Sequence, residues 1–75
     1  MDTRNLTCLN EGDSAFISSL HTMGRMRRRL LDLGLIEGTR VRCTQKSPCG
    51  DPVAYSVRGA VIAIRNEDAR KIFVK

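Results

Sequence analysis

The sequence predicts a mainly β protein, a small closed or nearly closed barrel of five short strands with one amphipathic helix and one helical turn. Its 75 residues, 41% of them hydrophobic, suffice for one small core and leave no room for a second. Several short runs alternate apolar and polar residues, as strands do, and only residues 25–33 show helical spacing. Closure of the sheet would remove the exposed strand edges that invite aggregation. We therefore expect a single domain over residues 1–75.

The chain begins with a polar lead-in over residues 1–12, in which Leu6 to Leu9 is the one candidate for a short extended piece. The sequence Glu11-Gly12-Asp13 signals a turn. A first strand is expected over residues 14–18, with Phe16 facing away from its two apolar neighbours. These residues therefore contribute one strand and little regular structure before it.

Residues 25–33 form the expected helix, which either Thr22 or Gly24 would cap. Apolar residues at i, i+4 and i+7 share one face of it, and the opposite face carries charge. The apolar positions are Met26, Leu30 and Leu33, and the charged positions are Arg25, Arg28 and Asp32. This is the pattern of a helix that packs on a core with one face.

The helix is expected to end at Gly34, because a residue with positive φ is needed just past a helix end. Leu35 would then contact Leu30, as in a Schellman ending. Residues 36–39 read as a four-residue turn, with Gly38 at the position that tolerates positive φ in a type II turn. From there the apolar period changes from 3.6 to 2, so the chain enters a strand.

The remaining strands are expected over residues 39–46, 53–57, 60–64 and 72–75. Their inward positions are Val41, Cys43, Val53, Tyr55, Val57, Ile72 and Val74. The run 60–64 is apolar on both faces, so we expect both of its sides to be covered, one of them by the helix. Arg58-Gly59 signals a hairpin turn, and a helical turn is expected over residues 66–71 with Asn66 as its N-cap.

The formal net charge of +5 permits an acidic protein face, a nucleic acid or an anionic membrane surface as partner. Single-strand binders usually add an aromatic platform, but this chain has no tryptophan, one tyrosine and two phenylalanines. The charge does not choose among these partners, and the few aromatics argue against single-strand binding and against a groove for proline-rich peptides. Our expectation is a partner other than nucleic acid. No apolar run approaches the ~20 residues that span a bilayer, and the N-terminus lacks a secretory apolar stretch. A cytoplasmic protein that is not inserted in a membrane is expected.

Few residues here are candidates for catalysis or metal binding. The three cysteines, Cys8, Cys43 and Cys49, show no CxxC spacing, so free thiols are expected, with Cys49 the most exposed. His21 is the only histidine, and a metal site using it with Cys43 or Cys49 would need tertiary contact. A Cys49 nucleophile with His21 as base has no sequence signature. The stretch 50–52 lacks the glycine-rich run and Lys-Ser/Thr ending of a phosphate loop. We expect no catalytic residue, no cofactor and no bound metal.

Four arginines, Arg25, Arg27, Arg28 and Arg29, make the helix the main candidate for a functional surface. They are either a solvated face, a surface that recognises an acidic protein, or a nucleic-acid contact. Leu31 lies beside this basic face and off the apolar stripe. The proline-containing loop 48–52 offers a stiff second contact. The predicted partner-binding residues are Arg25, Arg28, Leu31, Pro48, Asp51 and Pro52.

Several spaced motifs together resemble the FeoA family, the ferrous iron transport protein A family. They are Gly12-x-x-Ala15-x-Ile17, Arg29-Leu30-x-x-Leu33-Gly34-Leu35-x-x-Gly38-Thr39-x-Val41, Pro48-x-Gly50-Asp51-Pro52, and Gly59 through Ala63-Ile64-Arg65 to Glu67-x-Ala69-x-x-Ile72-x-Val74. The chain departs from the family pattern at Glu37, where proline is usual, at Cys49, where a larger apolar residue is usual, and at Ile64, where leucine is common.

The resemblance implies an SH3-like barrel that is a non-enzymatic cytosolic accessory of bacterial ferrous iron uptake. Its implied partner is a FeoB-type transporter, a membrane permease with a cytoplasmic GTPase domain. A related domain occurs at the C-terminus of metal-dependent transcription repressors. The alternative function is therefore that of a regulatory module, in particular one linked to nucleic acid. A small metal-binding or metal-sensing protein is a third possibility. Fold alone does not choose among these functions.

Overall fold

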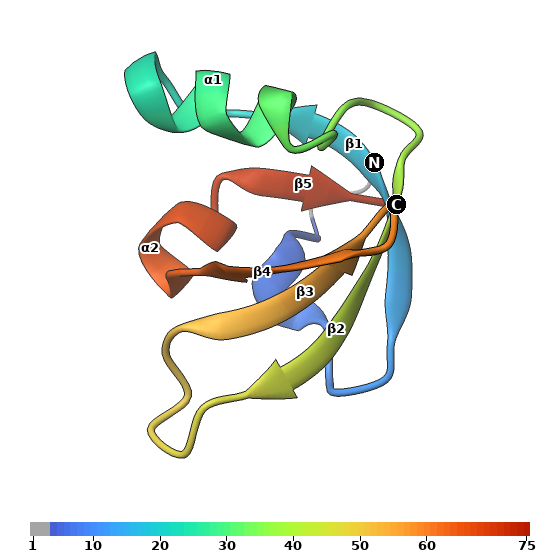
Figure 1. The fold of residues 1–75 in the computed structure, drawn as a ribbon, viewed down its shortest axis with the longest axis vertical. Coiled ribbons are helices and arrows are strands. Elements are labelled where there is room, and N and C mark those ends of the chain that lie inside the picture. The colour runs from blue at the N-terminus through green and yellow to red at the C-terminus, as the bar shows by residue number, and fades with distance from the viewer. Residues whose placement is uncertain (1–3) are drawn as a thin grey trace.

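The computed structural model describes residues 4–75, whose strands form one antiparallel sheet in the order β4-β3-β2-β1-β5 (Figure 1). The strands are β1 (Ser14–Leu20), β2 (Arg40–Lys46), β3 (Val53–Val57), β4 (Ala60–Ile64) and β5 (Ile72–Val74). The helices are α1 (Gly24–Asp32), α2 (Asn66–Ala69) and the 3₁₀ turn η1 (Leu6–Cys8). The predicted mainly β fold with five strands and one substantial helix is confirmed.

The sheet curls around the core without closing. In the described part of the chain no strand pairing joins β4 to β5, so these two strands are its edges. The outer edge of β5 is nevertheless covered, because Asn5 pairs with Phe73 and the Val74 N–H donates to the Arg4 carbonyl at 2.9 Å. Backbone pairing of this kind protects an edge strand from pairing with another molecule.

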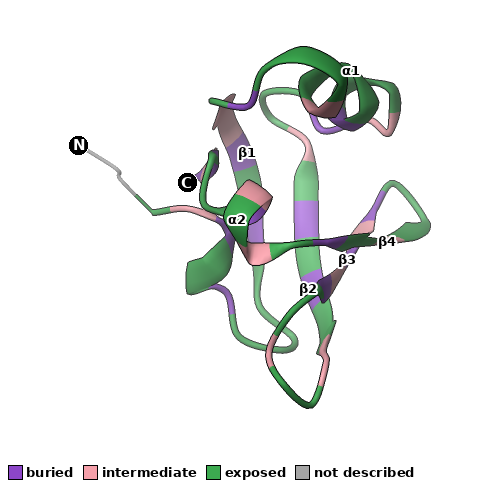
Figure 2. Ribbon diagram, turned by 90° about the vertical axis from the view of Figure 1, so that its left-hand side faces the viewer, coloured by how far each residue is buried: buried purple, intermediate pink, exposed green. Residues whose placement is uncertain are grey.

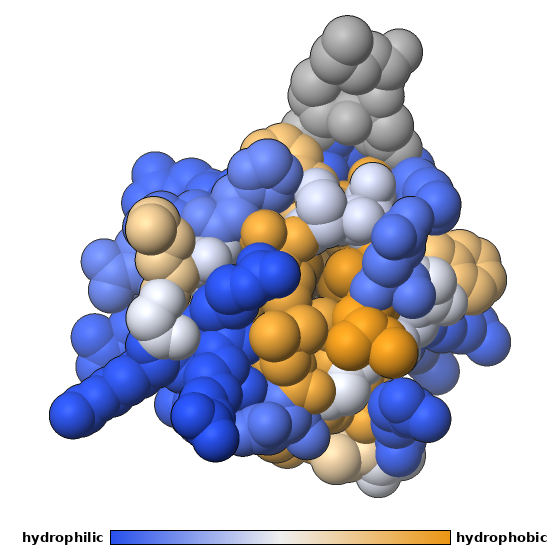
Figure 3. Space-filling model, turned by 90° about the horizontal axis from the view of Figure 1, so that it is seen from above, coloured by the Kyte–Doolittle hydropathy of each residue, from blue (hydrophilic) through white to orange (hydrophobic). Residues whose placement is uncertain are grey.

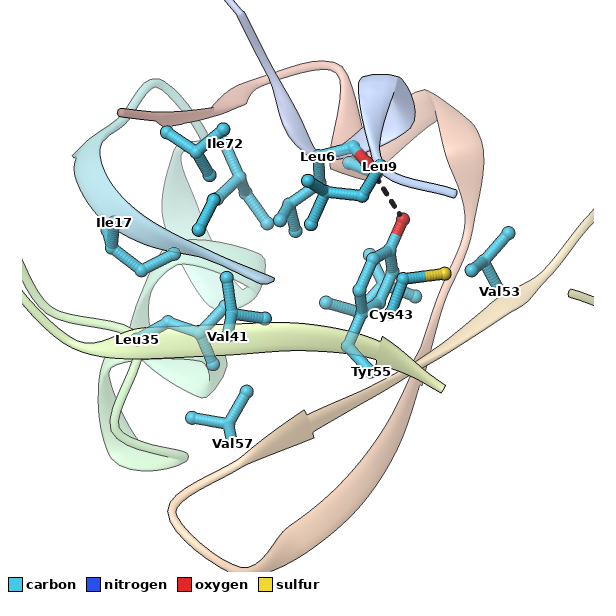
Figure 4. Close-up of a cluster of buried hydrophobic side chains, with 14 of the residues drawn as sticks. Leu6, Leu9, Ile17, Leu35, Val41, Cys43, Val53, Tyr55, Val57 and Ile72 are labelled. Carbon is cyan, nitrogen blue, oxygen red and sulfur yellow. Dashed lines mark hydrogen bonds between the residues drawn. The ribbon is translucent and has the colours of Figure 1, made fainter. Parts of the chain in front are cut away.

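The core is made of the inward faces of the strands, as the alternation predicts (Figures 2 and 4). All seven predicted inward positions of β2, β3 and β5 are buried, and they are Val41, Cys43, Val53, Tyr55, Val57, Ile72 and Val74. On β1, Ala15 and Ile17 are buried while Phe16 is exposed. The Tyr55 hydroxyl donates to the Leu6 carbonyl at 3.4 Å, which ties η1 to the centre of the sheet.

The expected extended piece at Leu6 to Leu9 is wrong. These residues enter a 3₁₀ turn because the side chain of Asn5 accepts the Thr7 N–H at 2.9 Å and so caps its start. Leu6 and Leu9 both enter the core, with exposed fractions of 0% and 6%. Most of the predicted lead-in is therefore a structural part of the domain, and residues 1–3 of it lie outside the described residues.

The expectation that β4 is covered on both sides is also wrong. Only Ile64 of this strand is buried, and Val61 is 66% exposed. Val61 pairs with Ser56 on the outer face of the sheet. β4 is an edge strand, and its outward apolar residues Val61 and Ala63 remain exposed to solvent.

The end of α1 follows the sequence prediction closely. Gly34 has φ +99°, its N–H donates to the Leu31 carbonyl, and the Leu35 N–H donates to the Leu30 carbonyl, both at 3.0 Å. These are the two bonds of a Schellman motif. Leu30 and Leu35 are both buried, which completes the motif's apolar contact. The following turn is also confirmed, because Gly38 has φ +88° and the Thr39 N–H donates to the Ile36 carbonyl.

The start of α1 differs from the prediction. Met23 is the N-cap, in extended conformation, and its side chain makes no capping hydrogen bond. Thr22 does not cap the helix, because it lies one residue too early and is buried, with Oγ1 unpartnered. Gly24 does not cap it either, since it is already the first helical residue.

Candidate functional site

The outer face of α1 carries two arginines that the fold does not use. Arg25 and Arg28 are exposed and make no hydrogen bond or ion pair with any described residue. Arg27 differs, because its Nη1 donates to the Leu20 carbonyl at 3.0 Å. Arg29 lines the groove between α1 and β4. Arg27 and Arg29 therefore lie along the fold, whereas Arg25 and Arg28 do not contribute to it in this way.

Leu31 lies at the edge of a groove between α1 and β1 that has a volume of about 260 Å³ and a mixed lining. Its apolar residues are Ile17, Leu20, Leu31, Leu35 and Ile36, and its polar residues are Ser18, Ser19, Arg27 and Glu37. Leu31 and Ile36 are 39% and 46% exposed, so its upper edge is open to solvent. Figure 3, which views the molecule from the side of α1, shows apolar surface here between hydrophilic regions. We call this surface the α1–β1 groove.

The sequence prediction found Leu31 and missed Ile36. Ile36 lies in the turn after the helix, where a residue has no periodic pattern to mark it. The residue type alone could have marked Ile36 as a contact residue, because a large aliphatic side chain is unusual in a tight turn that leads into a strand. Since Ile36 remains half exposed, it adds an apolar contact point beside Leu31.

The loop with Pro48 and Pro52 lies far from this groove. Figures 1 and 2 place α1 at one end of the molecule and the β2–β3 loop at the other. Both prolines are exposed. The six predicted partner-binding residues therefore form two separate surfaces, and the structure does not bring Pro48, Asp51 and Pro52 together with Arg25, Arg28 and Leu31.

Asp51 has a structural contact within its own end of the molecule. Its Oδ1 accepts the Asn66 N–H at 3.0 Å, and Asn66 Nδ2 donates to the Gly50 carbonyl at 2.9 Å. The predicted N-cap role of Asn66 is wrong, because Arg65 is the N-cap and Asn66 is the first helical residue. A carboxylate from the β2–β3 loop instead satisfies an N–H at the start of α2.

The cysteines and His21 are the residues that the sequence offered for metal binding or nucleophilic catalysis. Within residues 4–75, no group of three or more His, Cys, Asp or Glu side chains is placed to hold a metal ion. His21 Nε2 lies 3.0 Å from Ser19 Oγ and its ring packs edge-on against Phe73, 4.7 Å between centroids. Cys43 is buried, and burial raises the pKa of its thiol. Cys49 is exposed, and so is Cys8, which the sequence did not single out. The absence of a metal, cofactor or catalytic residue stays a prediction.

Comparison with known proteins identifies one family. Residues 4–75 match the sequence profile of the FeoA domain. A protein of Porphyromonas gingivalis, described as a fusion of Fe(2+) transport protein A with the Fe(2+) transporter FeoB, is 36% identical over 70 residues. The match covers 93% of this chain and 8% of the fusion protein, so the chain corresponds to a small part of that relative.

Solved structures show the same fold. The FeoA protein of Chlorobium tepidum is 34% identical with a TM-score of 0.90, over 95% of this chain and 68% of that one. FeoA of Stenotrophomonas maltophilia, solved with zinc and described as an SH3 domain protein, is 29% identical with a TM-score of 0.85, over 96% and 89%. A manganese-dependent transcriptional repressor matches at 18% identity and TM-score 0.82, over 95% and 40%, which shows the shared fold alone.

None of the helices in residues 4–75 has the length and apolar character needed to cross a bilayer.

Proposed function

The chain belongs to the FeoA family, and from this premise we propose that it is a non-enzymatic accessory protein of ferrous iron uptake. It acts in the cytoplasm by direct contact with a FeoB-type transporter. The Porphyromonas gingivalis relative supports this partner, because it joins a related domain to FeoB in one polypeptide. Domains that act on each other are held together by such a link at high effective concentration.

The observation that carries the proposed mode of action is that α1 borders the α1–β1 groove and also carries two unpartnered arginines. Leu31 and Ile36 supply an apolar contact that the core does not need, since both stay partly exposed. Arg25 and Arg28 lie on the same helix as Leu31 and have no acidic partner in residues 4–75. Protein interfaces commonly combine an apolar centre with a charged rim. The complementary surface on the transporter is therefore apolar at its centre and acidic at its edge.

The test is a titration of the purified chain with the transporter's soluble cytoplasmic domain and with the full transporter in detergent. Leu31→Ser and Arg28→Glu should each weaken binding by about tenfold, as the loss of a buried anchor or a paired charge does. The Arg28 effect should shrink as salt rises, because exposed charge contacts are screened. Both variants should melt near the wild-type temperature.

Matched controls lie elsewhere on the chain. Val61→Ser removes an exposed aliphatic side chain from β4, and Arg70→Glu reverses an exposed charge after α2. Both should bind as the wild type does. The proposal is wrong if the wild type binds neither form of the transporter, or if the Leu31→Ser/Arg28→Glu double variant binds as tightly as the wild type.

A further inference from the structure

The outer face of the sheet carries a second concentration of arginines, separate from α1. Arg40 and Arg42 on β2 and Arg58 in the β3–β4 turn line one hollow of about 660 Å³. We call it the arginine hollow. Its other lining residues are Glu37, Gly38, Thr39 and Ser56. The strand and turn that build the hollow take no part in the α1–β1 groove, although Glu37 borders both.

Strand register explains why these side chains gather. Arg42 pairs with Ser56 across β2 and β3, so the two residues stand side by side on the outer face. Arg40 is two residues earlier on β2 and therefore points to the same face. Val41 pairs with Val57, which brings Arg58 beside the start of β2. The guanidiniums of Arg40 and Arg42 on β2 thus lie beside the Ser56 hydroxyl on β3. The guanidinium of Arg58, in the turn after β3, lies at one end of this group.

The charge of the hollow is largely uncompensated. None of its three arginines forms an ion pair with a described residue, and Glu37 is the only acidic residue in the lining. Arg40 makes a single side-chain hydrogen bond, from Nη2 to Ser14 Oγ at 3.3 Å. Each guanidinium has five N–H donors and no acceptor, so most donors here face solvent. Like charges that line one hollow repel each other, and an anion bound among them would relieve that repulsion.

The Arg58 side chain is exposed, but its stem lies against the end of α1. A Cβ at Gly34 would lie 2.7 Å from Arg58 Cδ and 3.7 Å from Nη1, so the Arg58 side chain runs directly over Gly34. Its backbone is fixed as well, in the positive-φ conformation of the hairpin turn, with φ +51°. Because one side of its stem lies against Gly34, Arg58 has fewer conformers to lose when it binds a ligand.

We propose that the arginine hollow binds an oligophosphate, either free pyrophosphate or the diphosphate part of a nucleotide. The planar guanidinium matches the geometry of phosphate oxygens and binds them in bidentate fashion, which is how arginine differs from lysine. Ser56, which pairs with Arg42, supplies a further hydroxyl donor to the same space. Three arginines around an open hollow fit a compact ligand with several negative charges. The proposal is independent of the transporter contact described above.

The test is titration of the isotope-labelled full chain at low salt with sodium pyrophosphate, and in separate arms with ADP and GDP. Saturable shifts of the backbone amide signals of Gly38, Thr39, Arg42 and Ser56 are expected. A stronger response to a nucleotide than to pyrophosphate assigns the nucleotide as the ligand, and the reverse assigns the free diphosphate. No saturable shift of these signals in any arm overturns the proposal.

Variants separate a built site from general positive charge. The double variant R40Q/R42Q should lose at least about tenfold in affinity, the effect of removing charged hydrogen bonds. The matched control R25Q/R28Q removes the same charge from α1 and should stay within about twofold of the wild type. Arg58→Lys keeps the charge without the planar fork and should also weaken binding. Thermal melting confirms that each variant is folded.

Two further outcomes contradict the proposal. An equal loss of affinity in R40Q/R42Q and R25Q/R28Q would show that net charge alone attracts the anion. Saturable binding to polyglutamate or to phosphatidylglycerol vesicles, with none to pyrophosphate or nucleotides, would assign the hollow to an acidic protein segment or to a membrane surface instead.

Discussion

The Arg58 side chain crosses the end of α1 so closely that a Cβ at Gly34 would stand 2.7 Å from its Cδ. Gly34 therefore meets two separate requirements. Its φ of +99° lies in a region that residues with a Cβ rarely adopt, and the space where that Cβ would lie is filled by a side chain from the β3–β4 turn. The first requirement is visible in the sequence, and the second arises only when the sheet brings residue 58 back to the helix.

Gly34→Ala should lower the free energy of unfolding by about 1–3 kcal/mol, from strain at positive φ and displacement of Arg58. Urea unfolding of four proteins, the wild type, Gly34→Ala, Arg58→Ala and the double variant, separates the two causes. In the Arg58→Ala background the cost of Gly34→Ala should be smaller, because only the backbone strain is left. Equal costs in both backgrounds would show that Arg58 imposes no constraint on residue 34.

Leu30→Ala should destabilise the protein by about 2–5 kcal/mol, the usual range for truncating a buried leucine. Leu30 is 2% exposed and its carbonyl accepts the Schellman bond from Leu35, so the change opens a cavity under the helix end. Leu31→Ala is the matched control on the same helix. Because Leu31 is 39% exposed, it should cost less than about 1 kcal/mol. Chemical unfolding measures both, and similar losses would place Leu31 in the core.

The features that the sequence predicted well are those set by local physics. The alternation along β2 and β3 places Val41 and Tyr55 inward because successive strand residues point to opposite faces. The Schellman ending follows from Gly34, which can adopt positive φ just past the helix and brings Leu35 back onto Leu30. In each case the residues that determine the structure are neighbours in the chain, so their pattern is readable without the fold.

The errors arise where a distant residue decides the outcome. Leu6 is in the core because Tyr55, 49 residues away, and the edge of β5 pass over it. Asn66 is not a cap because Asp51 supplies the acceptor from another loop. The exposure of Val61 depends on β4 being an edge strand, which no pattern within 60–64 reveals. The predicted partner-binding residues fall on two separate surfaces for the same reason, since no local signal places the loop 48–52 relative to α1.

Asp51→Ala should destabilise the protein by about 0.5–2 kcal/mol, the usual cost of losing a helix N-terminal acceptor. It should also raise the hydrogen-exchange rate of the Asn66 amide, whose acceptor is Asp51 Oδ1. Asp32→Ala is the control, because Asp32 is an exposed carboxylate with no partner among residues 4–75. Thermal melting and amide exchange check both variants. An unchanged Asn66 exchange rate in Asp51→Ala would refute the contact.

The three thiols should react in two groups with an aromatic disulfide reagent. Cys8 and Cys49 are exposed and should react within the native protein, whereas Cys43 is fully buried and should react only on unfolding. The raised pKa of Cys43 also lowers its thiolate fraction, and the thiolate is the reactive form. Absorbance of the released thiol counts the groups under native and denaturing conditions. A count below three in denaturant, without reductant, would indicate a disulfide and contradict the prediction of free thiols.

Tyr55 should make the protein sensitive to alkali. Burial, with a smaller contribution from the nearby Cys43, raises the pKa of Tyr55 from 10.0 to about 12. The folded protein therefore keeps the phenol proton over a pH range in which the unfolded chain loses it. The stabilisation is fully present below pH 10 and is lost as pH rises toward 12. A shift of this size corresponds to roughly 2–3 kcal/mol. The raised pKa of Cys43 acts in the same direction from its ordinary value of 9.0 upward.

Tyr55→Phe separates the titration from the packing. At neutral pH the variant should lose about 1 kcal/mol, because the hydroxyl no longer donates to the Leu6 carbonyl while the ring still fills the core. Between pH 10 and 12 its unfolding free energy should fall less steeply than that of the wild type, since Cys43 is then the main group of raised pKa still titrating. Urea unfolding at a series of pH values measures both slopes. Parallel slopes for the two proteins would mean that Tyr55 ionises as easily in the folded chain as in the unfolded one, and the close packing of its hydroxyl against η1 would then be wrong.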